Sequence, residues 1–176
     1  MLIFDDRGLL PIQDYPMSLE ELRTSLLVTG PQDGSPWDTN KRMTLVNNLG
    51  VLVNQLWRVG ITEIFIDGSF VEDKASPGDI DGYFVADVTT LPDIVRELNS
   101  IDPHKIWSWK NQDRIYDRNS AKWQLPMWHR YRVELYPHVG QPSGILDEYG
   151  VEQMFPAAFR KTRDTFEPKG IVKIIK

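Results

Sequence analysis

A long helix is predicted where apolar residues lie three or four positions apart between Val46 and Leu56. Ser35 fits its N-cap, Pro36 its first position and Gly60 its end. Shorter helices are predicted for residues 19–27, behind a capping box of Ser18 and Glu21, for residues 91–99, and once or twice between residues 146 and 163.

Between the helices, short runs rich in β-branched and aromatic residues predict strands. These runs are residues 62–67, 79–86, 130–136 and 171–175, and residues 105–122 are a candidate hairpin. Helices that alternate with strands indicate an α/β (α+β) fold, with a mixed β-sheet flanked by helices. We expect one domain over residues 1–176, with a core of motifs from about residue 40 to 136.

The composition of the 176 residues narrows the class of protein. The sequence has no cysteine, which excludes disulfides and thiolate metal sites and suits a reducing compartment. No stretch approaches the roughly 20 apolar residues of a membrane span, and the acidic N-terminus does not resemble a secretory signal. We therefore expect a cytoplasmic protein without a membrane partner.

Charge is unevenly distributed along the chain. Residues 1–100 carry 16 acidic and 7 basic side chains, whereas residues 101–176 carry 9 acidic and 13 basic ones. An acidic half beside a basic half would suit a site for a metal and a phosphate. A chance division across a solvated surface explains the same counts, and charge alone favours that explanation.

Three carboxylates are the candidate catalytic and metal-binding residues. Asp79 and Asp81 lie two apart in a predicted strand, so both side chains point to one face. Glu134 occupies a later strand and would join them if the two strands are neighbours. Carboxylates this close repel one another, and a divalent cation relieves that repulsion; Mg²⁺ prefers such oxygen ligands, and Mn²⁺ is an alternative.

Four further residues are candidates for binding a nucleotide. Gly68 and Ser69 follow a strand directly, where glycine permits close backbone approach and N–H groups with a hydroxyl can hold a phosphate. Lys74, in the next loop, would add positive charge. Arg132 would share a strand face with Glu134 and lie near a triphosphate.

The order of these motifs resembles the DNA polymerase β-like nucleotidyltransferase superfamily, and most closely a small prokaryotic and phage branch of it. The pieces are a strand ending in Gly68-Ser69, the Asp79-Ile-Asp81 pair ten residues later, and the lone acid Glu134. Two features depart from the superfamily's pattern. The third acid is Glu rather than the commoner Asp, and Asp67 stands where an apolar residue is usual.

The resemblance implies an activity. Asp79, Asp81 and Glu134 would hold two Mg²⁺ ions while a nucleoside monophosphate, AMP being our guess, moves from a nucleoside triphosphate to an acceptor. Small members of the superfamily often modify a protein or a tRNA, in toxin–antitoxin or phage-defence systems, so we expect a macromolecular acceptor. One alternative is a non-catalytic antitoxin or interaction protein with the same fold. Another is an RNA-binding domain, based on the basic C-terminal half and the tryptophans.

Other motifs that would indicate a different function are absent or have a structural explanation. The sequence contains no P-loop and no nucleophile elbow, and Pro77 removes an acid that an EF-hand would need. The three histidines lack metal-ligand spacing. Four tryptophans could form a stacking wall for a base, but we favour a core of large rings; they are Trp107, Trp109, Trp123 and Trp128.

Overall fold

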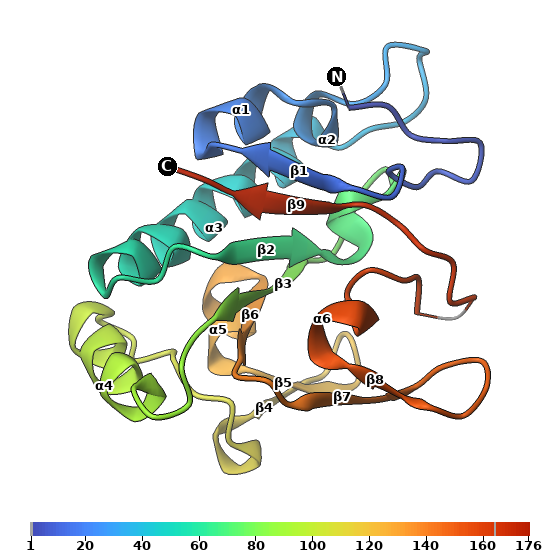
Figure 1. Cartoon of the computed structure of the whole chain (residues 1–176). Coiled ribbons are helices and arrows are strands. Elements are labelled where there is room, and N and C mark those ends of the chain that lie inside the picture. The colour runs from blue at the N-terminus through green and yellow to red at the C-terminus, as the bar shows by residue number, and fades with distance from the viewer. Residues whose placement is uncertain (1, 164) are drawn as a thin grey trace.

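The computed structural model describes residues 2–163 and 165–176 and is built on a five-stranded mixed sheet (Figure 1). Its strands lie in the order β1-β9-β2-β3-β6. The outer pairs β1–β9 and β3–β6 are parallel, and β2 is antiparallel to both of its neighbours. Their bounds are β1 Asp14–Met17, β2 Ile64–Asp67, β3 Ile80–Val85, β6 Val133–His138 and β9 Ile171–Ile174.

Helices and two small hairpins surround this sheet, which confirms the predicted mixed α/β (α+β) class. The helices are α1 Leu19–Thr24, α2 Leu26–Thr29, α3 Thr39–Arg58, α4 Leu91–Ile101, α5 Pro126–Tyr131 and α6 Phe155–Ala158. The 3₁₀ turns are η1 Gly68–Val71 and η2 Asn111–Asp113. The hairpins are β4 Ile115–Asp117 with β5 Lys122–Gln124, and β7 Pro142–Leu146 with β8 Glu152–Met154.

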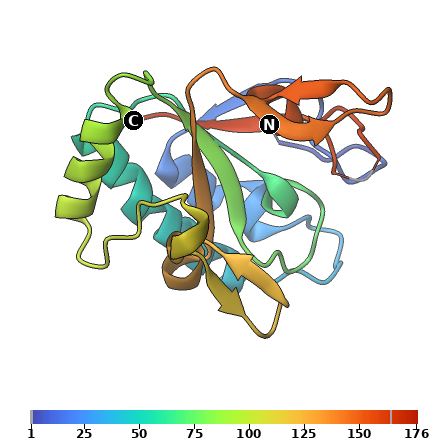
Figure 2. The same cartoon turned by 90° about the horizontal axis from the view of Figure 1, so that it is seen from below.

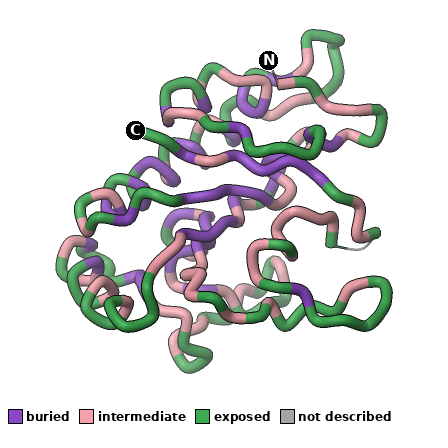
Figure 3. The backbone as a smooth tube through the Cα atoms, in the orientation of Figure 1, coloured by how far each residue is buried: buried purple, intermediate pink, exposed green. Residues whose placement is uncertain are grey.

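The sheet has one apolar face and one mixed face. Alternation along β3 sends Ile80 and Phe84 into the large core that α1, α2 and α3 complete. Figure 3 shows most of β2, β3 and β9 as buried. Tyr83 points the other way, into a smaller cluster with Phe65 that α6 covers. Asp81 shares that second face with Tyr83. The acidic candidates therefore lie on the side of the sheet that α3 does not cover.

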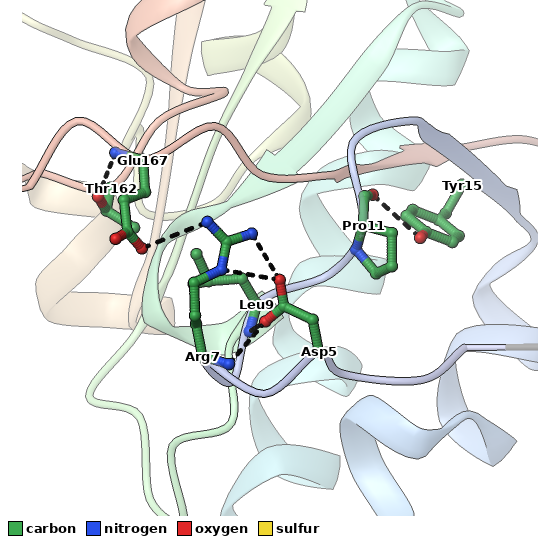
Figure 4. A network of polar contacts seen from close by, with 7 residues as sticks. All are labelled: Asp5, Arg7, Leu9, Pro11, Tyr15, Thr162 and Glu167. Carbon is green, nitrogen blue, oxygen red and sulfur yellow. Dashed lines mark hydrogen bonds and ion pairs between the residues drawn. The ribbon is translucent and has the colours of Figure 1, made fainter.

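The two ends of the chain meet in the fold. β9 lies between β1 and β2, so the last strand joins the N-terminal segment to the centre of the sheet. Arg7 pairs with Asp5 and lies 3.7 Å from the carboxylate of Glu167, which connects the N-terminal loop to the segment before β9 (Figure 4). These contacts hold the C-terminal segment next to the mixed face.

Several predicted elements are confirmed, with shifted boundaries. The capping box of Ser18 and Glu21 starts α1, but the predicted helix 19–27 is interrupted at Ser25 and continues as α2. The long helix begins at Thr39 rather than at Ser35, because the Asp38 carboxylate accepts the Lys41 N–H at 3.0 Å and caps the first turn.

The strand predicted for residues 130–136 is wrong in its first half. Residues Pro126–Tyr131 form α5, and Arg132 then turns the chain with a left-handed φ of 54°. Strand β6 begins only at Val133. Arg132 therefore does not share a strand face with Glu134. Two elements that were not predicted are β1 and the β7–β8 hairpin.

Within the residues described, no helix combines the length and apolar character needed to cross a lipid bilayer.

Candidate active site

Asp81 and Glu134 come together because β3 and β6 are parallel neighbours. Asp81 is the register partner of Glu134, so both side chains leave the same face of the sheet at one level. Asp79 lies two residues earlier, just before β3. The sequence predicts all three acids on strands, which is confirmed for Asp81 and Glu134, whereas Asp79 lies just before its strand. The sheet order makes β3 and β6 adjacent.

Asp79 is fixed by a tryptophan. The Trp128 indole N–H donates a 2.7 Å hydrogen bond to Asp79 Oδ2. Trp128 is buried in α5, so the contact holds the turn before β3 against α5.

Glu134 is buried and hydrogen-bonded at both oxygens. The Tyr136 hydroxyl donates to Oε2 at 3.0 Å, and the Leu125 N–H donates to Oε1 at 3.4 Å. Burial raises the pKa of Glu134, while both hydrogen bonds oppose that rise. The carboxylate is therefore held in place by the chain on either side of α5.

Asp81 has the most perturbed environment of the three acids. Burial, and to a smaller extent the charges of Asp79, Glu134 and Asp67, raise its pKa to about 7. Asp67 contributes because it is the register partner of Asp81 on β2. Acidic groups that shift one another in this way lie within one electrostatic cluster.

Gly68 allows the backbone to approach that cluster. It has φ of +73°, and a Cβ at this position would lie 2.4 Å from Asp81 Oδ2. Ser69 follows within η1 and is half-buried. A side chain at position 68 would compete with Asp81 for space, which explains a glycine here in geometric terms.

The donor set suits a hard divalent cation, but its ligand geometry is incomplete. Three carboxylates are the oxygen ligands that Mg²⁺ prefers, and a cation would relieve the repulsion that raises the Asp81 pKa. Across residues 2–163 and 165–176, however, no three acidic or histidine side chains form a ready metal-binding group. Asp79 accepts its hydrogen bond from Trp128 and Glu134 accepts one from Tyr136.

The two predicted phosphate-binding cations occupy different surroundings. The Arg132 guanidinium stacks on the Trp128 ring, 3.7 Å from its centroid, and so lies beside the residue that holds Asp79. Lys74 is exposed in the loop before β3, and its carbonyl accepts a hydrogen bond from Arg42.

Sequence reasoning missed Arg42. This fully buried side chain of α3 donates to the carbonyls of Leu27, Phe70, Glu72 and Lys74. It also stacks on Trp37, 3.9 Å from the ring centroid. Burial lowers its pKa to about 10. Arg42 thereby fixes the loop from η1 to Lys74; no local sequence signal distinguishes it from a surface arginine of the helix.

Sequence reasoning also missed the cation next to Asp67. Lys169 is buried, its ammonium lies 3.1 Å from Asp67 Oδ1, and it hydrogen-bonds Glu72. The Asp67 contact has ion-pair distance without good hydrogen-bond geometry, so Oδ1 remains without a hydrogen-bond donor. Burial raises the pKa of Asp67 to about 7, although the Lys169 charge opposes this. The unusual Asp67 therefore has its own counter-ion from the C-terminal segment.

Comparison with known proteins identifies a family. Residues 2–175 match the sequence model of a family described as DUF6932, a family of unknown function. The chain belongs to this family. No curated protein and no solved structure matches it. The match covers nearly the whole chain, including every residue of the candidate site.

Proposed function

We propose that this member of DUF6932 is a metal-dependent nucleotidyltransferase. The observation that carries the proposal is the register of Asp81 with Glu134 on parallel neighbours, with Asp79 two residues before. Gly68 supports it, because the turn that follows β2 packs directly on the Asp81 carboxylate. The phosphates of a nucleoside triphosphate bound there would contact the N–H groups of this turn, beside the acids.

In this proposal Asp79, Asp81 and Glu134 hold Mg²⁺ or Mn²⁺. The cation would supply charge neutralisation for the entering and leaving oxygens of an in-line displacement. An acceptor hydroxyl attacks the α-phosphorus, the bond to the bridging oxygen breaks, and pyrophosphate leaves. Asp81 takes the hydroxyl proton as the general base. Gly68 and Ser69 orient the phosphates, and Lys74 and Arg132 add positive charge.

In this proposal ATP is the donor, AMP is the group transferred, and the acceptor is a macromolecule, either a protein or a tRNA. A toxin–antitoxin or phage-defence role and a cytoplasmic location belong to the same proposal; the cysteine-free sequence is in line with that location.

A label-transfer experiment tests the activity. The protein is incubated with α-labelled nucleoside triphosphates, Mg²⁺ and cell extract, and incorporation into protein and RNA is measured. We expect transfer by the wild type and a loss of at least about 100-fold in Asp81→Asn, which removes charge and keeps size. Asp93→Asn, in an exposed carboxylate on α4, is the matched control. Equal transfer by wild type and Asp81→Asn would refute the proposal.

One observation favours a second candidate, a non-catalytic interaction protein. Asp79 and Glu134 already accept hydrogen bonds from Trp128 and Tyr136, as structural carboxylates do. Thermal unfolding separates the two candidates. A nucleotide with Mg²⁺ that binds only the folded state raises the melting temperature, whereas the interaction protein shows no shift with any nucleoside triphosphate.

A further inference from the structure

The β4–β5 hairpin exposes a pair of aromatic rings. Trp123 is 63% exposed and Tyr116 is 47% exposed, although large rings are usually buried. They are register partners on the two strands, and their centroids lie 5.5 Å apart. Both rings therefore belong to one solvent-facing surface.

The other predicted core tryptophans behave differently. Trp107 and Trp128 are buried, and Trp109 is half-buried with its indole N–H bonded to the Leu135 carbonyl. The expectation of a core residue is confirmed for Trp107 and Trp128 and is wrong for Trp123. Burial explains the first two rings, and Trp123 requires another explanation.

Basic side chains flank the exposed rings. Residues 110–124 contain four basic and two acidic residues. The basic residues are Lys110, Arg114, Arg118 and Lys122, and none of them forms an ion pair with a residue that the structure describes. Both acids already accept local hydrogen bonds, Asp113 from Ser108 and Asp117 from Ser120. Unpaired cations beside open aromatic faces are complementary to a nucleic-acid strand.

Two of the basic residues bracket the strand that carries Tyr116. Arg114 directly precedes β4, and Arg118 directly follows it, in the turn that leads to β5. Arg114 reaches across the hairpin and donates to the Trp123 carbonyl at 3.1 Å. A basic residue therefore stands at each end of this strand.

The base of the hairpin adjoins the candidate active site. His129 of α5 bonds the Ile115 carbonyl at 2.9 Å, and Leu125, directly after β5, bonds Glu134. Figure 2 shows the hairpin extending away from the sheet while its base remains beside α5 and β6. A strand bound on the hairpin would therefore have one end near the carboxylates.

We propose that the β4–β5 hairpin is a binding surface for single-stranded nucleic acid. Bases stack on Trp123 and Tyr116, and Arg114 and Arg118 contact the phosphates. The further statement that this strand is the acceptor, through a terminal hydroxyl, rests on the proposed function. Binding itself does not depend on that function.

Fluorescence anisotropy tests the binding. A labelled single-stranded oligonucleotide of roughly 12 nucleotides, as RNA and as DNA, is titrated with the full chain at low salt in EDTA. We expect binding of the RNA, the DNA or both, with an affinity that falls as salt rises. The affinity of Trp123→Ala should be about tenfold lower. Tyr149→Ala, which removes an exposed ring of the β7–β8 turn, should bind as the wild type does.

Two charge variants and heparin complete the test. Arg118→Ala should weaken binding and reduce its salt dependence, whereas Arg96→Ala, on exposed α4, should do neither. Absence of binding at low salt would overturn the proposal, and so would equal affinities of Trp123→Ala and Tyr149→Ala. Heparin bound as tightly as the oligonucleotide, with no effect of Trp123→Ala, would show charge alone and would also overturn it.

The outcomes separate this inference from the proposed enzyme activity. Asp93→Asn should bind the oligonucleotide as the wild type does, because Asp93 lies on α4, outside the hairpin. Binding without label transfer would refute the nucleotidyltransferase and keep the hairpin surface. Label transfer without oligonucleotide binding would refute the hairpin surface, keep the nucleotidyltransferase and indicate a protein acceptor.

Discussion

At the scale of single residues, the site is defined by how its acidic charges are compensated. Asp79 and Glu134 accept hydrogen bonds, and Asp67 has a buried cation, Lys169. Among the residues that the structure describes, Asp81 has neither, and burial and its acidic neighbours raise its pKa. A lysine with almost no exposed surface is stable only when paired, because the cost of removing its charge from water is large. Lys169 thus allows an extra acid to stand beside the cluster.

Removing this cation tests its role. We expect Lys169→Met to lower the free energy of unfolding by about 3 kcal/mol, because Asp67 then remains buried without its counter-ion. The double variant Asp67→Leu/Lys169→Met should regain most of that loss. Lys173→Met, in an exposed pair with Glu63, should cost less than about 1 kcal/mol. Chemical denaturation measures all three; equal losses in the single and double variants would contradict the assignment.

At the scale of elements, the turn from β2 into η1 sets the distance between backbone and acids. Gly68 adopts a positive φ there, and the position of an added Cβ is taken by the Asp81 carboxylate. Arg42 holds the following loop by four carbonyls, so the turn cannot easily move away. The geometry of the site therefore depends on Gly68 and on Arg42 of α3, which lies 26 positions earlier in the sequence.

A pair of glycine variants isolates this effect. Gly68→Ala and Gly60→Ala both place Cβ at a positive φ, but Gly60 has no heavy atom within 4 Å of that Cβ. Each should lose about 1 kcal/mol from backbone strain. We expect Gly68→Ala to lose about 1 kcal/mol more and to displace Asp81, since the new Cβ overlaps its carboxylate. Denaturation curves with similar losses for both variants would contradict a close packing of Gly68 on Asp81.

At the scale of the whole molecule, β9 holds the sheet together. It hydrogen-bonds β1 on one side and β2 on the other, and it buries Ile171, Val172 and Ile174. The chain reaches this position only after all other elements are complete, so the contacts that close the sheet are among the most distant in sequence. Long-range pairings of this kind make a fold dependent on its last segment.

Truncation tests that dependence. Deletion of residues 171–176 should abolish cooperative unfolding, because β1 and β2 lose their shared neighbour and the core loses three buried side chains. Deletion of the exposed Lys176 alone should leave the melting temperature within a few degrees of the wild type. Calorimetry gives both results, and a sharp transition in the longer deletion would show that β9 is dispensable.

The sequence by itself determined most of the local structure around the site. Capping by Ser18 and Glu21, the strands of β2, β3 and β9, and the mixed α/β class follow from nearest-neighbour patterns. The two-residue spacing of Asp79 and Asp81 and the core-facing neighbours of Glu134 were equally readable. These features depend on periodicity, which a chain carries in its sequence.

Tertiary structure alone decided which distant residues meet. The parallel pairing of β3 with β6 joins Asp81 to Glu134, and β9 brings Lys169 to Asp67. Packing of Met127, Trp128 and Tyr131 made residues 130 and 131 the end of helix α5, where the local pattern predicted a strand. Trp123, read as a core residue, lies on the surface because its two-stranded hairpin has no layer packed over that face. Such contacts depend on burial against remote elements, and no local pattern encodes them.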